Sequence, residues 1–167
     1  QLAREAVAKF INADEDEIVF VKNTTEAINL VAYAWARNNL KKGDVILISE
    51  LEHHSNILPW TLLVDEIGVE VRWMPIDESG QLIANSKQDW ESVIDEKVKL
   101  IALTHVSNAL GVINPLKGII KAAKEKGIVT LVDGAQAVPH MAVDVKDLDC
   151  DFYAFSGYKL YGPTGIA

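Results

Sequence analysis

The apolar positions of the chain change period along its length. Apolar residues near the start recur at helical spacing, which predicts an opening amphipathic helix. Short β-branched runs then alternate with longer helical stretches. The runs predict six strands, at Ile18–Val21, Val45–Ser49, Val69–Met74, Val98–Thr104, Val129–Asp133 and Phe152–Ser156. The stretches between them predict helices at Thr25–Arg37, Asn56–Ile67, Lys87–Ile94 and Leu116–Lys126.

This alternation predicts an α/β fold with one domain. The runs that begin at Val45, Val98 and Val129 are almost continuously apolar, as expected where helices cover both faces of a parallel sheet. Strands that alternate with helices imply right-handed crossovers and a three-layer α/β/α sandwich with a mostly parallel sheet. In such a sheet, ligands bind beyond the carboxyl ends of the strands.

Composition narrows the class of protein. The chain has 167 residues, 49% of them hydrophobic and 24% charged, which suits one ordinary globular domain. A net charge of -8 without a basic cluster argues against nucleic-acid and anionic-membrane partners. There is neither an apolar run of about 18 residues nor a signal pattern, so we expect a cytoplasmic protein.

Cysteine and histidine usage points away from disulfides and metals. The single cysteine, Cys150, excludes an internal disulfide, and the four histidines are not spaced like zinc ligands, so we expect no metal. Cys150 comes just before the last predicted strand. We therefore expect a buried structural thiol, at the end of the sheet opposite the ligand crevice.

Polar residues at the ends of the predicted strands, or shortly after them, are candidates for one shared site. Because the carboxyl ends of parallel strands meet at one edge of a sheet, these side chains should collect in one crevice. They are Thr24, Thr25, His53, Asn108, Asp133, Gln136, Ser156 and Lys159.

Two of these residues suggest specific chemistry: Asp133 as the partner of a cation, and Lys159 as a nucleophile. Asp133 ends a buried apolar run, and a buried carboxylate needs a cationic partner, for which a protonated pyridine nitrogen would serve. The alternative is an aspartate that only caps the turn at Gly134. Lys159 has small and aromatic neighbours that exclude water and favour a nucleophilic amine, as Schiff-base chemistry requires. The alternative is an ordinary solvated lysine.

The remaining candidates fit a phosphate and an aromatic ring. Thr24 and Thr25 begin a predicted helix, whose free N–H groups can bind phosphate, although ordinary N-capping by Asn23 or Thr24 is the commoner explanation for such residues. His53 is placed to stack on an aromatic ligand, and a satisfied structural histidine is the alternative. We expect His54 to be structural.

Five blocks of the sequence together resemble a known enzyme family. In order, they are NTTEAINLVA, ELEHHSNILPW, THVSNALGVINP, VDGAQAVPHMAVDV and DCDFYAFSGYKLYGPTGIA. They resemble the motifs of class V aminotransferase-type enzymes, specifically cysteine desulfurases and selenocysteine lyases. The resemblance implies the large domain of fold-type I enzymes, with a seven-stranded mostly parallel sheet and pyridoxal 5'-phosphate as cofactor.

The resemblance also implies individual roles. Lys159 resembles the lysine that forms the Schiff base, and Asp133 the carboxylate that pairs with the pyridine nitrogen. His53 resembles the imidazole stacked on the ring. Gln136 and Asn108 resemble the groups around the cofactor's phenolic oxygen. The phosphate ligands are Thr25 and Ser156, with Thr24 a weaker candidate and Tyr158 standing where the family usually has a histidine.

The implied reaction is the removal of sulfur from L-cysteine, which gives alanine and an enzyme persulfide. The implied partners are the L-cysteine substrate, a sulfur-acceptor protein in iron–sulfur cluster assembly, and a second subunit in a homodimer. The family's persulfide cysteine and small domain would follow Ala167, and a further segment would precede Gln1. We therefore expect residues 1–167 to be an inactive large-domain fragment of a longer chain.

Other readings of the sequence stay open at this point. Within the family, the chain could belong to a selenocysteine lyase or another class V enzyme. Outside it, the chain could be a non-catalytic binding protein that keeps the fold. A dinucleotide-binding module lacks support because no G-x-G-x-x-G follows the first strand, and a serine hydrolase because G-x-S-x-G is absent.

Overall fold

A computed structural model describes residues 2–83, 89 and 93–167 of the chain. Its sheet is entirely parallel, with the strand order β2-β1-β3-β4-β5. The strands are β1 (Val45–Ser49), β2 (Glu70–Met74), β3 (Val98–Thr104), β4 (Val129–Asp133) and β5 (Phe152–Ala154). The predicted α/β fold with a parallel sheet is confirmed.

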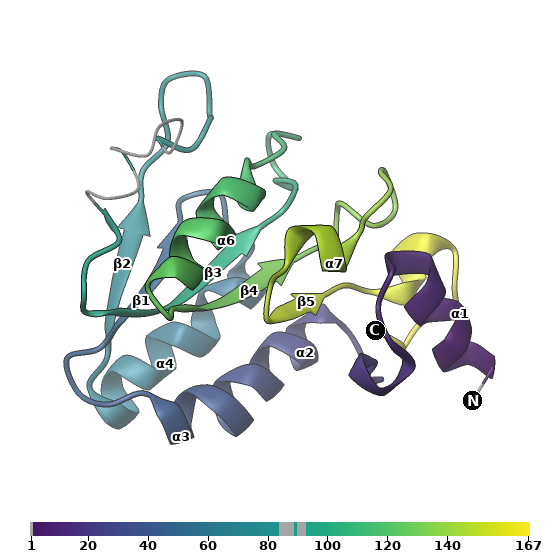
Figure 1. Cartoon of the computed structure of the whole chain (residues 1–167), viewed down its shortest axis with the longest axis horizontal. Helices are drawn as coiled ribbons and strands as arrows, with labels where there is room; N and C mark the ends of the chain where they lie inside the picture. Colours follow the sequence, from purple (N-terminus) through teal and green to yellow (C-terminus); the bar gives the residue numbers. More distant parts are fainter. Residues whose placement is uncertain (1, 84–88, 90–92) are drawn as a thin grey trace.

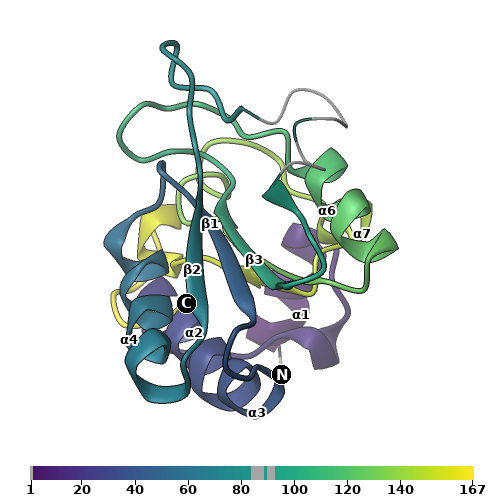
Figure 2. The ribbon, with the colours of Figure 1, turned by 90° about the vertical axis from the view of Figure 1, so that its left-hand side faces the viewer.

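Helices cover both faces of this sheet, as the three-layer prediction requires (Figures 1 and 2). One face carries α2 (Thr24–Val31), a π-helical segment (Ala32–Ala36), α3 (Arg37–Asn39) and α4 (Leu58–Ile67). The other face carries α6 (Leu116–Glu125) and α7 (Val145–Leu148). The opening helix α1 (Leu2–Ile11) lies beyond β5, near the carboxyl end of the chain.

The alternation of side chains along the strands separates two cores. Ile46 and Ile48 of β1 point to the face that carries α2 and α4, where they pack with the fully buried Trp60. Leu47 points to the opposite face and packs with Ile119 of α6. Because successive strand residues face opposite sides, a strand covered on both faces is apolar at every position. That explains the uninterrupted apolar runs of the sequence.

Short 3-10 turns connect several of these elements. They are Glu15–Glu17, η3 (His54–Asn56) and η4 (Gly157–Leu160). The glycine that follows α6, Gly127, has a φ of +66°, a conformation in which a side chain is strained. Helix α6 thus ends within one residue of the predicted range Leu116–Lys126. No helix among the described residues is long and apolar enough to cross a membrane.

One predicted strand is wrong. The segment Ile18–Val21 is extended but belongs to no strand of the sheet. Val21 instead exchanges two backbone hydrogen bonds with Ala167, of 3.0 and 2.8 Å. An apolar run of four residues forms a strand only where a neighbouring backbone offers a ladder of partners, and here one residue offers both bonds. The helix predicted at Lys87–Ile94 lies outside the described residues, apart from 89, 93 and 94.

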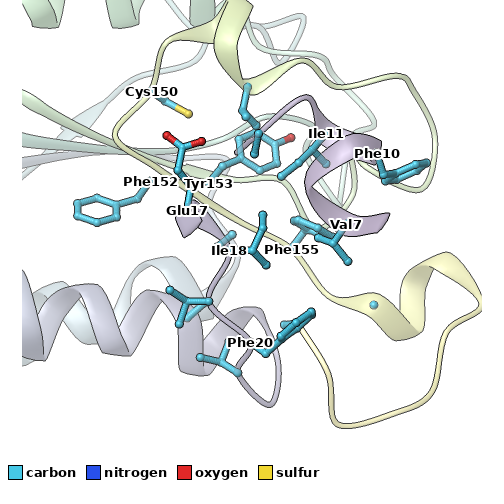
Figure 3. A pocket seen from close by; sticks show the side chains of 18 of the residues that line it. Val7, Phe10, Ile11, Glu17, Ile18, Phe20, Cys150, Phe152, Tyr153 and Phe155 are labelled. Carbon is cyan, nitrogen blue, oxygen red and sulfur yellow. The ribbon is translucent and has the colours of Figure 1, made fainter. Parts of the chain in front are cut away.

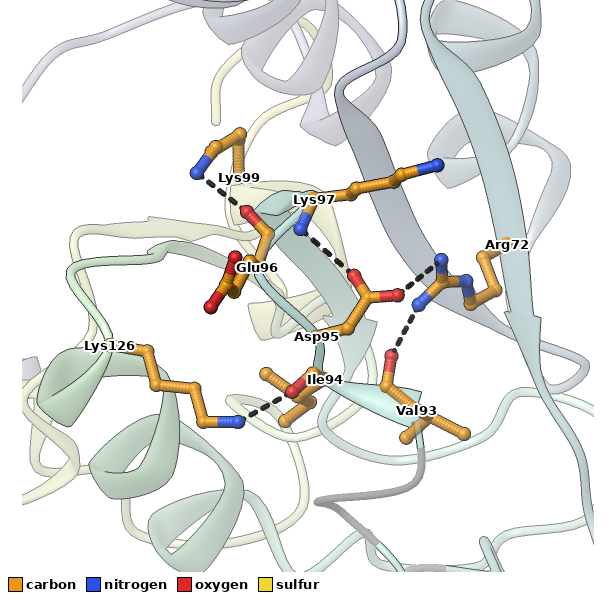
Figure 4. A network of polar contacts seen from close by, with 8 residues as sticks. All are labelled: Arg72, Val93, Ile94, Asp95, Glu96, Lys97, Lys99 and Lys126. Carbon is orange, nitrogen blue, oxygen red and sulfur yellow. Dashed lines mark hydrogen bonds and ion pairs between the residues drawn. The ribbon is translucent and has the colours of Figure 1, made fainter.

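Polar contacts hold the amino end of β3, opposite the edge where the predicted site lies (Figure 4). Arg72 of β2 forms an ion pair of 3.0 Å with Asp95 and donates a 2.9 Å hydrogen bond to the carbonyl of Val93. The pKa of Asp95 is lowered, mainly by the hydrogen bond from Arg72. Lys126, after α6, donates to the carbonyl of Ile94 over 2.6 Å. These contacts join the segment before β3 to β2 and α6.

Candidate functional site

The predicted site residues surround one small cavity at the carboxyl ends of the strands. Its volume is about 60 Å³. The strands contribute residues at their last position or in the loop that follows, because residues before a strand lie at the opposite edge. Of the predicted residues, the cavity lining contains Thr24, Thr25, His53, Asn108, Asp133, Gln136, Ser156 and Lys159.

Tyr158 is the predicted site residue that does not line this cavity. Its side chain is 47% exposed, whereas its neighbour Lys159 is half-buried and lines the cavity. Both residues belong to the 3-10 turn η4, in which successive side chains point about 120° apart. Although Tyr158 directly precedes Lys159 in the sequence, its side chain therefore does not reach the cavity that Lys159 lines.

The amino end of α2 forms one wall of the cavity. Asn23 caps this helix by accepting a 2.9 Å hydrogen bond from the Glu26 N–H. Thr24 is buried, and its N–H and hydroxyl contact Ser156 Oγ at 3.0 and 2.6 Å. Thr25 is exposed, and its hydroxyl contacts Ser55 Oγ at 2.8 Å. Helix α2 thus presents hydroxyl groups at its positive end, a combination that suits an anion.

Asp133 is the buried carboxylate of the site, with 4% of its surface exposed. Its Oδ1 accepts a 2.9 Å hydrogen bond from the Ala135 N–H, so it does close the turn after β4. Burial raises the pKa of Asp133, while that hydrogen bond and the charges of Lys159 and His53 act in the opposite direction. Asp133 therefore caps the turn and also has cationic neighbours, so its role as a turn residue does not exclude a role as the partner of a cation.

His53 lies at the rim of the cavity as the N-cap of η3. Its Nδ1 accepts a 3.1 Å hydrogen bond from the Ser55 N–H and lies 2.9 Å from Ser55 Oγ. Because Nδ1 accepts from a backbone donor, a neutral His53 ring carries its proton on Nε2. Asn108, on the loop after β3, is exposed at the same rim, and Gln136 is half-buried.

Sequence reasoning missed several polar groups near the site, among them Thr104, which lines the cavity at the end of β3. Ser55 lines the cavity and bridges Thr25 to His53, and its position two residues after His53 in a predicted loop was the available signal. Glu52 is buried beneath the loop after β1, and no local pattern distinguishes it from a solvated glutamate. Its burial results from contacts with β3 and with η3.

Cys150 lies away from the polar cavity, as predicted, but it is half-buried rather than fully buried. It lines a second cavity of about 850 Å³ between α1, β5 and the segment that begins at Ile18 (Figure 3). Desolvation raises the pKa of the Cys150 thiol to about 12. A thiol that stays protonated at neutral pH is a poor nucleophile, which agrees with a structural residue.

Comparison with known proteins identifies what this chain resembles. The family model for aminotransferase class-V matches residues 1–167. A cysteine desulfurase of Pectobacterium carotovorum is 52% identical over 167 residues, which cover 99% of this chain and 40% of that protein. A cysteine desulfurase of Yersinia pseudotuberculosis is also 52% identical, with the same coverage. The chain thus spans about 40% of the length of these curated relatives.

Solved structures give the same picture. The cysteine desulfurase CsdA of Escherichia coli superposes with a TM-score of 0.92 at 42% identity, over 98% of this chain and 41% of its own. The apo cysteine desulfurase of Thermococcus onnurineus superposes with a TM-score of 0.91 at 44% identity, over 99% of this chain and 40% of its own. A C-DES mutant with glycine covalently linked to its PLP cofactor reaches a TM-score of 0.87 at 26% identity, over 98% of this chain and 43% of its own.

Proposed function

Since the chain belongs to the aminotransferase class-V family, we propose that it forms the pyridoxal-phosphate-binding part of a cysteine desulfurase. The observation that carries the proposal is that the Lys159 amine and the buried Asp133 carboxylate line the same cavity as the amino end of α2. The relatives of similar sequence and structure that bear the name cysteine desulfurase support the choice of reaction. When bound, the cofactor supplies an electron-withdrawing ring that weakens bonds of an attached amino acid.

The residues present fit the phosphate end of this cofactor. The amino end of α2 offers the positive end of its dipole, and Thr25 and Ser156 add hydroxyl groups. Thr24 is buried against Ser156, so we give it the supporting role of orienting that hydroxyl. Tyr158 lies outside the cavity lining, and we assign it no phosphate contact.

The residues also fit the ring end. A cationic ring nitrogen next to Asp133 would favour the ionised carboxylate, in the same sense as the charges of Lys159 and His53. We assign His53 to the face of the ring, Lys159 to covalent attachment, and Asn108 and Gln136 to the ring oxygen. His53, Asn108 and Thr25 are exposed, so a ligand larger than the cavity can extend past this rim.

The finer parts of the proposal concern what the cofactor acts on. L-cysteine is the proposed substrate, because the curated relatives are named for it. We further propose that the parent enzyme passes sulfur to an acceptor protein in iron–sulfur cluster assembly. It would act as a homodimer in the cytoplasm, with neither nucleic acid nor a membrane as partner. The net charge of -8 supports that last point. Selenocysteine lyase is the alternative within the family.

Trapping of the cofactor tests the proposal directly. Pyridoxal phosphate in excess is added to the chain, the mixture is reduced with borohydride, and the modified residue is mapped by mass spectrometry. We expect the label on Lys159. A label spread over exposed lysines, or none on Lys159, would contradict the proposal.

Sulfide release from the same sample tests whether Cys150 is a structural thiol or a nucleophile. Because the one thiol of the chain lines the other cavity, we expect labelling without sulfide production from cysteine. Efficient sulfide release that is lost in Cys150→Ala would show that the nucleophile has been misplaced.

A further inference from the structure

The loop after β1 carries a buried carboxyl group that the proposed function does not use. Glu52 immediately precedes His53 and has 9% of its surface exposed. Burial, with a smaller contribution from the Asp133 charge, raises the pKa of Glu52 to about 7. A carboxyl group this deeply buried is costly unless its oxygens are hydrogen-bonded, so its partners identify what it holds together.

Three donors from three separate elements converge on Glu52. At Oε1, the Ser49 hydroxyl donates from the end of β1, and the Thr104 N–H donates over 2.9 Å from the end of β3. At Oε2, Asn56 Nδ2 donates over 2.7 Å from η3. The carboxyl group therefore joins the carboxyl ends of two neighbouring strands to the turn that begins at His53.

The orientation of Asn56 makes an acceptor obligatory at Oε2. The indole N–H of the fully buried Trp60 can only donate, and it donates to Asn56 Oδ1 over 3.0 Å. Asn56 Nδ2 must then face Glu52, since turning the amide over would leave the indole without an acceptor. A glutamine amide at this position would place an N–H against either Asn56 or the Thr104 backbone donor.

The hydrogen-bond partners of Glu52 connect it to two parts of the polar cavity. On one side, His53 follows Glu52 directly, and its carbonyl accepts a 2.7 Å hydrogen bond from the Asn56 N–H. On the other side, Thr104 lines the cavity and is paired with Asp133 in the β3 and β4 register. Glu52 thus supports both a rim residue and the strand end that carries the buried carboxylate.

We infer that Glu52 is a positioning residue of this cavity, which holds His53 and the Thr104–Asp133 strand ends in the arrangement that receives the cofactor ring. It does not line the cavity, so it acts through the residues that do. The part of this inference that concerns the ring rests on the proposed function. The part that concerns the position of His53 does not.

The experiment uses chains with isotope-labelled histidine and has two readouts. The first is the NMR resonance of the His53 ring without cofactor, with the exposed His140 as an internal reference. The second is the affinity for pyridoxal phosphate from absorbance titration. Glu52→Ala should shift the His53 resonance and weaken binding by about tenfold or more, since three hydrogen bonds to a buried carboxyl group are lost. Glu52→Gln should show smaller changes in the same direction.

A matched control and a milder variant keep the test decisive. Glu50→Gln changes a nearby exposed glutamate that accepts from the Ile76 N–H over 3.1 Å, and it should leave both readouts unchanged. If Glu52→Ala does not fold, Glu52→Gln and Ser49→Ala, each of which disturbs part of the network, should still shift His53. A wild-type His53 resonance in every folded variant would overturn the inference. Failure of the wild-type chain to label at Lys159 would count against the proposed function instead, and the His53 resonance would still decide the role of Glu52.

Discussion

The cavity beside α1 measures about 850 Å³, whereas the cavity at the carboxyl ends of the strands measures about 60 Å³. The larger one is walled mainly by apolar side chains such as Phe10, Ile18 and Phe152 (Figure 3). The smaller one gathers a carboxylate, an amine, an imidazole and several hydroxyls from separate elements. The volume of a cavity depends on how closely the side chains around it pack. The reactive groups that line it depend on how many strand ends meet there. The smaller cavity is therefore the better candidate for chemistry.

The largest expected difference between the two regions concerns their lysines. Lys159 lines the polar cavity, and Lys146 lines the apolar one, where it forms a 2.7 Å ion pair with Asp14. Lys159→Ala should abolish borohydride-trapped pyridoxal phosphate at the site, because the amine is lost. Lys146→Ala should leave the label in place. Mass spectrometry of the reduced chains provides the measurement, and equal labelling of both variants would remove the distinction between the cavities.

A second prediction concerns the backbone just after Asp133. A Cβ on Gly134 would lie 2.1 Å from Cε1 of Tyr153, whose hydroxyl lies 2.9 Å from His105 Nδ1. Gly134→Ala should therefore lower the free energy of unfolding by about 3 kcal/mol, as overpacking in a closed site does. Gly111→Ala is the control, because a Cβ there meets no atom within 4 Å. Its positive φ of +71° should cost only about 1 kcal/mol.

Denaturant unfolding of the two glycine variants measures this difference. A Gly134→Ala variant as stable as Gly111→Ala would mean that the Tyr153 ring moves freely, and the turn after β4 would then not be held against β5.

The third prediction is a pH dependence that originates at Glu52, beside the polar cavity. Burial raises the pKa of Glu52 from 4.5 to about 7, so the folded state holds this proton more tightly than the unfolded state. The corresponding stability is fully present below about pH 4.5 and is lost as the pH rises through about 7. Up to roughly 3 kcal/mol is involved. The raised pKa of Asp133 acts in the same direction, whereas the lowered pKa of Asp95 acts in the opposite one.

The variant Glu52→Gln should flatten the part of the pH profile that Glu52 contributes. Unfolding free energies are measured from pH 4.5 to 8 for wild type, Glu52→Gln and the exposed control Glu50→Gln. We expect wild type and Glu50→Gln to share one slope. The same slope in Glu52→Gln would show that Glu52 does not titrate in this range.

The smallest expected effect concerns the apolar cavity. Because the pKa of the Cys150 thiol is raised to about 12, its alkylation by iodoacetamide at pH 8 should be much slower in the folded chain than in the unfolded chain. Timed mass spectrometry measures both rates. Equal rates would mean that water reaches the thiol. The apolar cavity would then not desolvate the groups that line it, and this difference from the polar cavity would disappear.

The polar edge of the sheet was predictable because its residues are tied to strand ends. Each buried run ends in a polar residue, and the carboxyl ends of parallel strands share one edge, so Asp133 and Lys159 had to lie near each other once the strands were assigned. The roles within that edge came from the resemblance rather than from spacing, since Asp133 also makes the turn contact that an ordinary capping residue would make.

Periodicity along the chain determined the layers, the parallel strands and the edge at which the candidate site lies, because those properties follow from local side-chain alternation. Tertiary structure decided the rest. Ile18–Val21 is no strand because its backbone meets a single partner residue, and Tyr158 misses the cavity because of the turn it occupies. Glu52 is buried because donors from β3 and η3 converge on it. Such contacts join residues distant in sequence, and no local pattern encodes them.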